Sequence, residues 1–278
     1  YSMKKAPKID ARYDLMPDPV AADLFSKING ASTKGTPYLS LLNTPKPNIL
    51  LIILESFTAK GVEVLEGVKS VTPQLNNLSK EGVLFSQFYA SGHRSNRGIG
   101  SLFSSYPGLP YNAIIENPFK TEKLPHLIKL IKEQDYQTAF YYGGEIDFAN
   151  LRAYFNQGKA DKIISKLDFD FSSNNTKWGI HDDVVFDTLF NDLKKEETPF
   201  FYTLFPLSSH EPFDIPVEPV FGSDNNENSF KSAMHYTDAC LGEFIEKAKK
   251  TTWWDQTLVV VTADHGTTQI KNTSNGQK

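Results

Sequence analysis

An uninterrupted apolar run, Asn48–Leu54 (NILLIIL), most constrains the fold of this 278-residue chain. It follows Pro45-Lys46-Pro47 and contains no polar residue after Asn48, so the strand that it predicts is apolar on both faces. Such strands are typical of parallel sheets that are covered by helices on each side. A second strand of this kind is predicted near the other end of the chain, at Leu258–Thr262. The two runs together predict an α/β fold.

Helical and strand patterns alternate along the chain between these two runs. Thr72-Pro73 predicts a helix start, with Thr72 as N-cap and Pro73 in the first helical position. Strands that alternate with helices in this way indicate a three-layer αβα sandwich with a mainly parallel central sheet. Further strands are predicted at Val83–Tyr89, Thr138–Tyr142 and Phe200–Phe205. Helices are predicted at Thr72–Gly82, Ser95–Tyr106, Leu124–Gln134, Asp147–Asn156, Ile180–Glu196 and Phe230–Lys250.

The chain is expected to divide near residue 45. Residues 1–45 have little periodic pattern and several prolines, which indicates an irregular arm or linker with one short helix around Ala21–Ile28. Residues 46–278 carry the alternating pattern and are expected to form one domain.

Composition excludes some classes of function. The formal net charge is −4 and no long basic run appears, so nucleic-acid binding is not expected as a main task. The single cysteine, Cys240, excludes an intramolecular disulfide and is expected to be a small core residue. No segment approaches the roughly 20 apolar residues of a membrane span.

Polar side chains follow the predicted strands where each of them ends. Glu55 follows the first strand, Asp264 and His265 follow the last, and His210 lies just beyond Phe200–Phe205. Ser95 lies in the segment GHRSNRG, between the predicted strand Val83–Tyr89 and a helix. Because sites in open α/β sheets form beyond the carboxyl ends of the strands, these residues are expected to converge.

Each of these residues taken alone has a simpler interpretation. A lone carboxylate is usually a cap or a surface charge, and a Ser before a helix is usually an N-cap. Together, however, four connections supply a Glu, a Ser, a His and an Asp-His pair on one edge of the sheet. Oxygen ligands with an imidazole suit Mn²⁺, Mg²⁺ or Zn²⁺.

Ser95 has the features of an activated nucleophile. A helix N-terminus favours an anionic group, and metal coordination lowers the pKa of a hydroxyl. Arg94 and Arg97 flank Ser95 and are expected to hold phosphate oxygens. The Gly-x-Ser-x-Gly pattern is missing around it, which argues against an ordinary serine hydrolase.

Four segments carry a resemblance to a known family. PNILLIILES, TPQLNNLSKEGVLFSQFYASGHRSNRG, SSHEPF and VVVTADHG follow one another in the family's order between about Lys46 and Gly266. They resemble the sulfatase-like branch of the alkaline phosphatase superfamily, and within it the lipoteichoic acid synthases and phosphoglycerol transferases.

The resemblance implies roles for individual residues. Glu55, Ser95, Asp264 and His265 would bind one divalent metal ion, Mn²⁺ or Mg²⁺ in first place, with Zn²⁺ or Ca²⁺ as alternatives. Ser95 would also be the nucleophile, where this group usually has Thr. His210 would bind the substrate and protonate the leaving group. Substrate-binding positions would be Arg94, Arg97, Asn150 and Arg152, together with His210.

The implied function is the metal-dependent transfer of a phosphoglycerol head group through a covalent Ser-phosphoryl intermediate, with a phospholipid or another anionic ester as substrate. Residues 46–278 would be the catalytic domain, at the extracytoplasmic face of a bacterial membrane. Membrane segments absent from this chain would anchor it, and residues 1–45 would be the linker. Two alternatives stay open: a phosphodiesterase or sulfuric ester hydrolase with water as acceptor, and an inactive domain that binds anionic ligands.

The sequence departs from the family in two places. True sulfatases have Cys or Ser in a Cys/Ser-x-Pro-x-Arg motif that is oxidised to formylglycine, whereas Ser95-Asn96-Arg97-Gly98 lacks that proline and the matching arginine. This speaks against sulfate-ester hydrolysis by the formylglycine route. The resemblance also implies another strand and a His-containing loop after Gly266, so the chain is expected to be truncated at its C-terminus or only partly ordered there.

The other histidines are interpreted more simply. Three of them, His126, His181 and His235, are expected to be structural. The role of His93, close to Ser95, stays open.

Overall fold

The computed structural model describes residues 15–29, 41–170, 176–196 and 199–271. The chain forms two compact units, residues 1–43 and residues 44–278. The first contains helix α1 (Asp18–Asn29), which covers the helix predicted around Ala21–Ile28. The interpretation of residues 1–45 as a linker stays a prediction. In the described ranges, no helix combines the length and the hydrophobicity that crossing a lipid bilayer requires.

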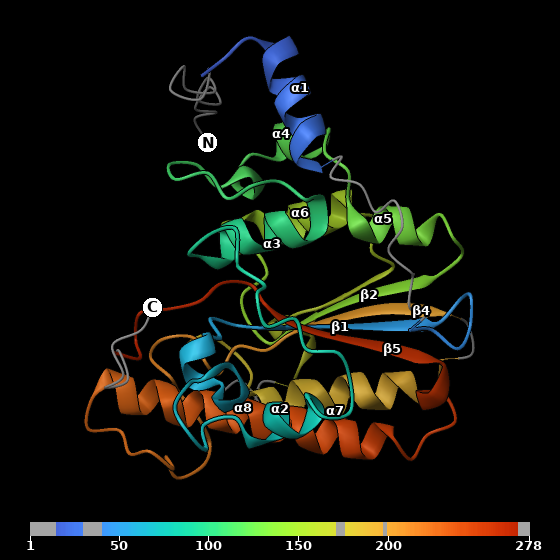
Figure 1. Cartoon of the computed structure of the whole chain (residues 1–278). Coiled ribbons are helices and arrows are strands. Elements are labelled where there is room, and N and C mark those ends of the chain that lie inside the picture. Colours follow the sequence, from blue (N-terminus) through green and yellow to red (C-terminus); the bar gives the residue numbers. More distant parts are fainter. Residues whose placement is uncertain (1–14, 30–40, 171–175, 197–198, 272–278) are drawn as a thin grey trace. The chain divides into compact units, whose positions relative to one another are not determined.

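The second unit is built on a five-stranded sheet in which all neighbouring strands are parallel (Figure 1). The strand order is β3-β2-β4-β1-β5, so the first and last strands of the sequence lie side by side. The predicted parallel sheet is therefore confirmed. The strands are β1 (Asn48–Leu54), β2 (Gln137–Tyr142), β3 (Lys162–Ile164), β4 (Phe200–Phe205) and β5 (Thr257–Ala263).

Helices cover both faces of the sheet, which confirms the three-layer αβα architecture (Figure 1). One face carries α2 (Pro73–Leu78), α7 (Asp182–Leu193) and α8 (Asn226–Ala248). The other face carries α3 (Ser95–Ser104), α4 (Pro118–Thr121), α5 (Leu127–Lys132) and α6 (Leu151–Gln157). Single 3₁₀ turns are η2 (Ala59–Gly61), η3 (Glu63–Leu65), η4 (Ile114–Glu116), η5 (Phe148–Asn150), η6 (Lys166–Asp168) and η8 (Trp254–Gln256).

Strand β1 explains why its sequence is apolar throughout. Leu50, Ile52 and Leu54 belong to the core beneath α7 and α8, whereas Leu51 and Ile53 belong to the core beneath α3 and α6. Successive side chains of a strand point to opposite faces, so a strand between two helical layers needs apolar residues at every position.

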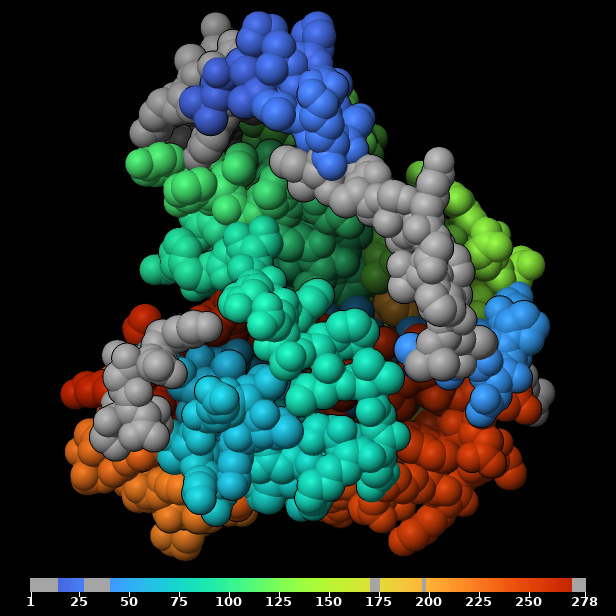
Figure 2. Space-filling model, viewed as in Figure 1, coloured from blue at the N-terminus to red at the C-terminus, as the bar shows by residue number. Residues whose placement is uncertain are grey.

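The predicted strand at Val83–Tyr89 is wrong. These residues form no strand in the structure, and Val83, Phe85, Phe88 and Tyr89 are exposed, Tyr89 by 82%. Figure 2 shows this stretch, in teal, on the surface of the molecule. A strand requires a hydrogen-bonded neighbour, and this segment joins no ladder among the described residues. The segment has the apolar composition of a buried strand, but it lacks the pairing with a neighbour that a strand needs.

Some element boundaries differ from the prediction because backbone conformation and tertiary contacts decide them. The predicted helix Asp147–Asn156 is interrupted, since Ala149 and Asn150 have φ values of 51° and 60°. Strand β3 was not predicted because three residues carry too little pattern.

The start of α2 is capped by a residue far away in the sequence. Thr72 is the N-cap and Pro73 opens the helix, as predicted, but the Thr72 hydroxyl donates to the Gly61 carbonyl and accepts no hydrogen bond from the α2 amides. Asp238 of α8 accepts instead from the amides of Gln74 (2.7 Å) and Leu75 (2.9 Å). Burial raises the pKa of Asp238 to about 6, and the two amides oppose this rise.

His126 is a buried histidine in the core beneath α3 and α6. Its ring lies 5.6 Å from the ring of Phe103 and 4.6 Å from that of Tyr154, measured between centroids. Neither of its ring nitrogens has a hydrogen-bond partner within the described part of the chain. Burial lowers the pKa of His126 to about 4 because the charged imidazolium is poorly solvated there.

We expect His126 to make the protein less stable in acid. Its pKa is about 4 in the folded protein, below the ordinary value of 6.5, so the unfolded chain binds more protons between these pH values. The free energy of unfolding should therefore fall by up to about 3 kcal/mol from this group as the pH decreases from 6.5 to 4. Urea unfolding at several pH values should show a smaller loss for His126→Leu than for the wild type. Equal pH dependence of both proteins would contradict this assignment.

Candidate active site

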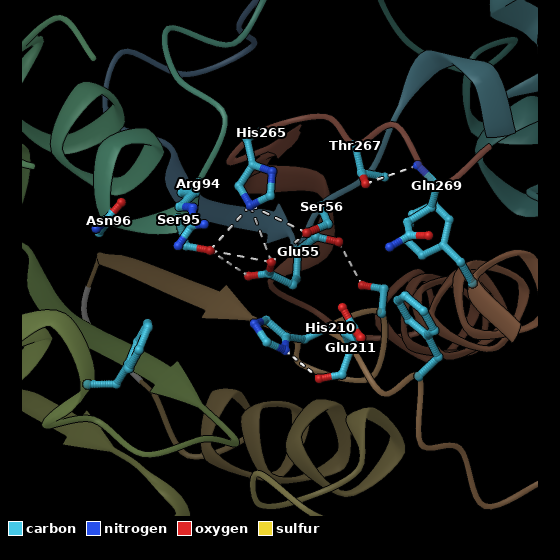
Figure 3. Close-up of a pocket in the computed structure, with 14 residues that line it drawn as sticks. Glu55, Ser56, Arg94, Ser95, Asn96, His210, Glu211, His265, Thr267 and Gln269 are labelled. Atoms are coloured by element: carbon cyan, nitrogen blue, oxygen red, sulfur yellow. Dashed lines mark hydrogen bonds and ion pairs between the residues drawn. The ribbon is translucent and has the colours of Figure 1, made fainter. Parts of the chain in front are cut away.

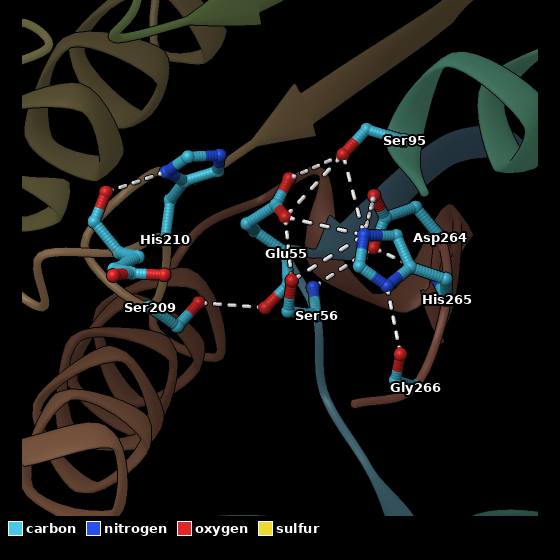
Figure 4. A network of polar contacts seen from close by, with 9 residues as sticks. Glu55, Ser56, Ser95, Ser209, His210, Asp264, His265 and Gly266 are labelled. Carbon is cyan, nitrogen blue, oxygen red and sulfur yellow. Dashed lines mark hydrogen bonds and ion pairs between the residues drawn. The ribbon is translucent and has the colours of Figure 1, made fainter. Parts of the chain in front are cut away.

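The carboxyl ends of β1 and β5 bring two acidic residues together. The strands run in register up to Leu54 beside Ala263, so Glu55 and Asp264 leave the sheet at neighbouring positions. With His265 they form a group whose ligand atoms all lie within 4.8 Å of one another (Figure 4). All three are buried, with Glu55 and Asp264 each 2% exposed. The convergence expected from the sequence therefore occurs at this edge of the sheet.

Helix α3 brings Ser95 to the same group. The Ser95 hydroxyl lies 3.1 Å and 3.3 Å from the two Glu55 carboxylate oxygens and 3.4 Å from His265 Nε2. This ten-residue helix begins at Ser95, so its first-turn amides lie beside the hydroxyl.

Gly98 allows α3 to approach β5 closely enough for these contacts. A Cβ atom at residue 98 would lie 2.1 Å from the backbone carbonyl oxygen of Asp264. A backbone atom cannot move aside as a flexible side chain can, so any larger residue pushes the helix away. The glycine thus sets the distance between the serine and the acidic pair.

The ligand atoms are oriented by backbone groups. Asp264 Oδ1 accepts from the amides of Ser56 (2.9 Å) and His265 (2.8 Å). His265 Nδ1 lies 2.8 Å from the Gly266 carbonyl, which can only accept, so Nδ1 carries the proton. Asp264 Oδ2 and His265 Nε2 are thereby left to face the centre of the group, which is how backbone partners commonly orient metal ligands.

The two carboxylates of the group influence each other's ionisation. Burial and the nearby Glu55 raise the pKa of Asp264 to about 8. Burial also opposes ionisation of Glu55, but the hydrogen bond and the charge of His265 hold the pKa of Glu55 below its ordinary value. Burial disfavours charge on His265 as well, yet the two acids raise its pKa to about 9. The buried site therefore stabilises positive charge at its centre.

These residues fit a divalent cation. Asp264 Oδ2 is buried and has no hydrogen-bond partner among the described residues, although a buried carboxylate oxygen normally has one. Two carboxylates, an imidazole and a hydroxyl form a set of hard oxygen and nitrogen donors. Glu55, Asp264, His265 and Ser95 are thus the residues that would hold the metal.

A pocket of about 320 Å³ opens beside this group (Figure 3). His210 and Arg94, both predicted as site residues, lie in its wall with Ser95. The full lining is Glu55, Ser56, Arg94, Ser95, Asn96, Phe148, Ser209, His210, Glu211, Phe213, Phe230, His265, Thr267 and Gln269.

The loop that carries His210 is held by a buried carboxylate. Asp182, at the start of α7, accepts from the amides of Leu207 (2.8 Å) and Ser208 (2.9 Å) and from the Thr237 hydroxyl (2.6 Å). Burial raises the pKa of Asp182, and these hydrogen bonds oppose that rise. The partners of Asp182 lie in distant segments, so local sequence pattern could not identify them.

Three predicted substrate-binding residues have other partners. The Arg97 guanidinium donates to the carbonyls of Leu109 (2.7 Å) and Pro110 (3.0 Å). The Asn150 amide donates to the Glu116 carbonyl, and Arg152 forms an ion pair with Asp147. Neither Arg97, Asn150 nor Arg152 belongs to the described residues that line the pocket. Their role in substrate binding stays a prediction without support from this arrangement.

Sequence reasoning missed other residues of the site. The Ser56 hydroxyl lies 2.7 Å from Glu55 Oε1 and 3.4 Å from His265 Nε2. Its position directly after Glu55 was a usable signal. The aromatic wall of Phe148, Phe213 and Phe230 gave no signal, because these residues come from three separate segments.

Replacing Gly98 tests the close approach of α3 to β5. We expect Gly98→Ala to lower the free energy of unfolding by about 1–3 kcal/mol, as overpacking usually does. It should also weaken divalent-metal binding, because Ser95 moves away from Glu55. Gly82→Ala is the matched control, since its Cβ would meet nothing closer than 3.8 Å. Calorimetry with Mn²⁺ measures both variants, and equal metal affinity would contradict the argument.

Replacing Asp264 tests the metal site. We expect Asp264→Asn without metal to be about as stable as the wild type, because a pKa of about 8 leaves the metal-free Asp264 carboxyl mostly protonated at neutral pH, and an amide is a neutral group of the same shape. Added Mn²⁺ should stabilise the wild type by about 2.7 kcal/mol at a hundredfold excess over its Kd, and the variant far less. Asp255→Asn, an exposed change beyond the other end of β5, is the control. The same metal-dependent rise in melting temperature in all three proteins would exclude Asp264 as a ligand.

Comparison with known proteins reveals relatives along most of the chain. The lipoteichoic acid synthase of Staphylococcus aureus is 27% identical over 233 residues, which is 79% of this chain and 36% of that protein. A protein in the alkaline phosphatase superfamily from Vibrio parahaemolyticus has a similar structure, with a TM-score of 0.79, 29% identity, and coverage of 95% of this chain and 66% of that one. The lipoteichoic acid synthase LtaP of Listeria monocytogenes gives a TM-score of 0.77 with 28% identity, over 90% of this chain and 63% of that one.

The chain thus spans about a third of the length of the curated relatives that it matches. Residues 47–277 match the family model described as Sulfatase. The match covers the whole sheet and the group formed by Glu55, Asp264 and His265. It confirms the predicted class, the sulfatase-like enzymes of the alkaline phosphatase superfamily. The chain belongs to the Sulfatase family.

Proposed function

We propose that this chain is the catalytic domain of a metal-dependent transferase of phosphoester head groups, with phosphoglycerol as the group and a phospholipid as its donor. The similarity to lipoteichoic acid synthases supports the choice of phosphoryl over sulfuryl chemistry. The sequence after Ser95 also supports it, since Ser95-Asn96-Arg97-Gly98 lacks the motif that sulfatases oxidise.

One observation carries the proposal: a serine hydroxyl at a helix N-terminus touches a buried group of metal-ligand type. Ser95 Oγ lies 3.1 Å from Glu55 Oε2 and faces a pocket (Figure 3). A divalent metal at this group, with Mn²⁺ or Mg²⁺ preferred, would lower the pKa of the hydroxyl. Ser95, after losing its hydroxyl proton to solvent, attacks phosphorus through Oγ, and the first-turn amides of α3 and the Arg94 guanidinium stabilise the charge on the phosphoryl oxygens.

His210, which lines the same pocket as Ser95, is the proposed proton donor and acceptor. As Ser95 Oγ bonds to phosphorus, the bond from phosphorus to the lipid alcohol breaks, and the departing oxygen takes a proton from the His210 imidazolium. In the second step the neutral imidazole accepts the proton of an incoming alcohol, whose oxygen displaces Ser95 from phosphorus. His210 suits both roles because one imidazole nitrogen can donate a proton when the ring is charged and accept one when it is neutral.

The acceptor decides between transfer and hydrolysis. The first half-reaction is the same when water replaces the alcohol, so the residues of the pocket serve both outcomes. A phospholipid donor places this domain beside a membrane surface, and we propose the extracytoplasmic face, with anchoring segments that lie outside this chain.

Ser95→Ala tests the proposal directly. With phosphatidylglycerol and Mn²⁺, the wild type should release diacylglycerol and acquire the mass of a phosphoglycerol adduct on the peptide that contains Ser95. Ser95→Ala should lose both turnover and adduct while keeping the melting temperature of the wild type. Ser56→Ala is the control, because Ser56 contacts the same Glu55 and His265 atoms and should still allow the adduct on Ser95. An adduct on Ser56, or turnover by Ser95→Ala, would remove Ser95 from the mechanism.

The same experiment separates the alternatives. Release of free phosphoglycerol in the presence of an alcohol acceptor would identify a hydrolase. Turnover of nitrophenyl sulfate in preference to the phosphodiester would identify a sulfuric ester hydrolase. Binding of phosphatidylglycerol without any adduct or product would identify an inactive domain that binds anionic ligands.

A further inference from the structure

The backbone carbonyl of Glu211 is a shared acceptor beside the pocket. It accepts a hydrogen bond from Trp178 Nε1 at 2.7 Å, and it lies 2.8 Å from His210 Nδ1. The Trp178 and His210 rings meet edge to face, with centroids 5.8 Å apart and planes at 79°. One indole therefore contacts the histidine ring directly and also holds the carbonyl that faces it.

This arrangement selects one tautomer of His210. His210 Nδ1 lies 2.8 Å from the Glu211 carbonyl oxygen, which can only accept a hydrogen bond, so Nδ1 carries the proton. Its Nε2 is then free to accept a proton when the ring is neutral and to donate one when it is charged. In Figures 3 and 4 this second nitrogen points towards Ser95 and Glu55 and away from the Glu211 carbonyl.

The backbone at Trp178 is held by hydrogen bonds, although the residue is 41% exposed. The Thr176 hydroxyl accepts from the amides of Trp178 (3.1 Å) and Gly179 (2.8 Å) and donates to the Gly179 carbonyl (2.9 Å). Gly179 itself packs closely against the end of β2, since a Cβ at residue 179 would lie 2.0 Å from the Gly143 carbonyl oxygen. The turn that carries the Trp178 side chain is therefore held by these hydrogen bonds and by the close packing of Gly179.

Among the described residues, Trp178 belongs to neither of the two hydrophobic cores. Its ring is covered on one side by the Lys177 ammonium, 4.8 Å from the ring centroid, and its N–H is directed at the Glu211 carbonyl. The indole N–H is the only donor of the Trp178 side chain, and it is directed at the carbonyl beside His210. This contact explains the position of the exposed indole better than core packing does.

We propose that Trp178 is a positioning residue that fixes the tautomer and the orientation of His210, so that Nε2 faces the leaving group. The inference rests on the proposed function for its chemistry. In that reaction the P–O bond to the lipid alcohol breaks, its electron pair stays on the departing oxygen, and that oxygen takes the Nε2 proton. The imidazole is left neutral with its remaining proton on Nδ1, where the Glu211 carbonyl still accepts it.

The first test observes the tautomer itself and needs no activity. Protein labelled with ¹⁵N-histidine, with diamagnetic Mg²⁺ added, gives ring ¹⁵N shifts that distinguish an Nδ1–H from an Nε2–H imidazole. The signals of His210 are identified by their loss in His210→Gln. We expect the Nδ1–H form in the wild type and a mixture of both forms in Trp178→Phe, which keeps an aromatic ring and loses the N–H donor. An Nε2–H form in the wild type, or an unchanged tautomer in Trp178→Phe, would overturn the inference.

The second test uses the leaving group. A nitrophenolate departs without a proton, whereas a glycerol-type alcohol needs one, so loss of a well-placed acid harms only the second substrate. For Trp178→Phe we expect kcat with the alkyl phosphodiester to fall roughly tenfold more than kcat with the nitrophenyl one, part of the roughly 10²–10⁴-fold that a positioned acid contributes. Trp254→Phe, in η8 before the start of β5, is the matched control and should leave the ratio unchanged.

An equal loss of kcat on both substrates would show a merely structural role for Trp178 and count against the inference. The Ser95 adduct is a separate observation. If the adduct fails to form while the tautomer depends on Trp178, the proposed function is wrong and the positioning of His210 stands. If the adduct forms while the tautomer ignores Trp178, only the inference is wrong.

Discussion

The parallel pairing of β1 with β5 is the constraint on which the rest of the site depends. These strands are the first and the last of the sheet in the sequence, yet they pair side by side in register up to Leu54 beside Ala263. The next residue on each strand is an acid, and both acids are buried. Burial, and after it the repulsion from the nearby Glu55 carboxylate, raises the pKa of Asp264 to about 8. A site of this kind is suited to a cation, and the apolar core beneath it holds the acids in place.

The nucleophile candidate depends on a second constraint, the close contact between a helix and the end of this strand pair. Ser95 begins α3, and Gly98, one turn later, lies against the backbone of Asp264. The missing Cβ at Gly98 allows the serine hydroxyl to come within 3.4 Å of His265. If a larger residue at position 98 pushed α3 away from β5, Ser95 would still lie at a helix N-terminus, but its hydroxyl would no longer contact Glu55.

The opposite wall of the pocket is organised by polar groups of the protein. Asp182 holds the amides that precede His210, and the Glu211 carbonyl holds the imidazole itself. Both anchors use backbone groups, which do not rotate as side chains do. In the proposed reaction, the candidate metal ligands on one side and the proposed proton carrier His210 on the other would both be held rigidly, and preorganisation of this kind lowers the reorganisation that a reaction requires.

The sequence alone determined the layered α/β fold, because the apolar pattern of Asn48–Leu54 fits only a strand that is covered on both faces. It also pointed to Glu55, Asp264 and His265, since polar residues directly after such strands stand out against their apolar surroundings. Ser95 was pointed to by its place at a predicted helix start between two arginines, although the strand expected before it does not form. Only the tertiary structure decided that Val83–Tyr89 is no strand and that Asp238 caps α2. It also decided that Arg97, Asn150 and Arg152 have other partners and do not line the pocket. Local pattern reports how apolar a segment is, whereas strand pairing and the partner of an arginine depend on residues that are distant in the chain and close in space.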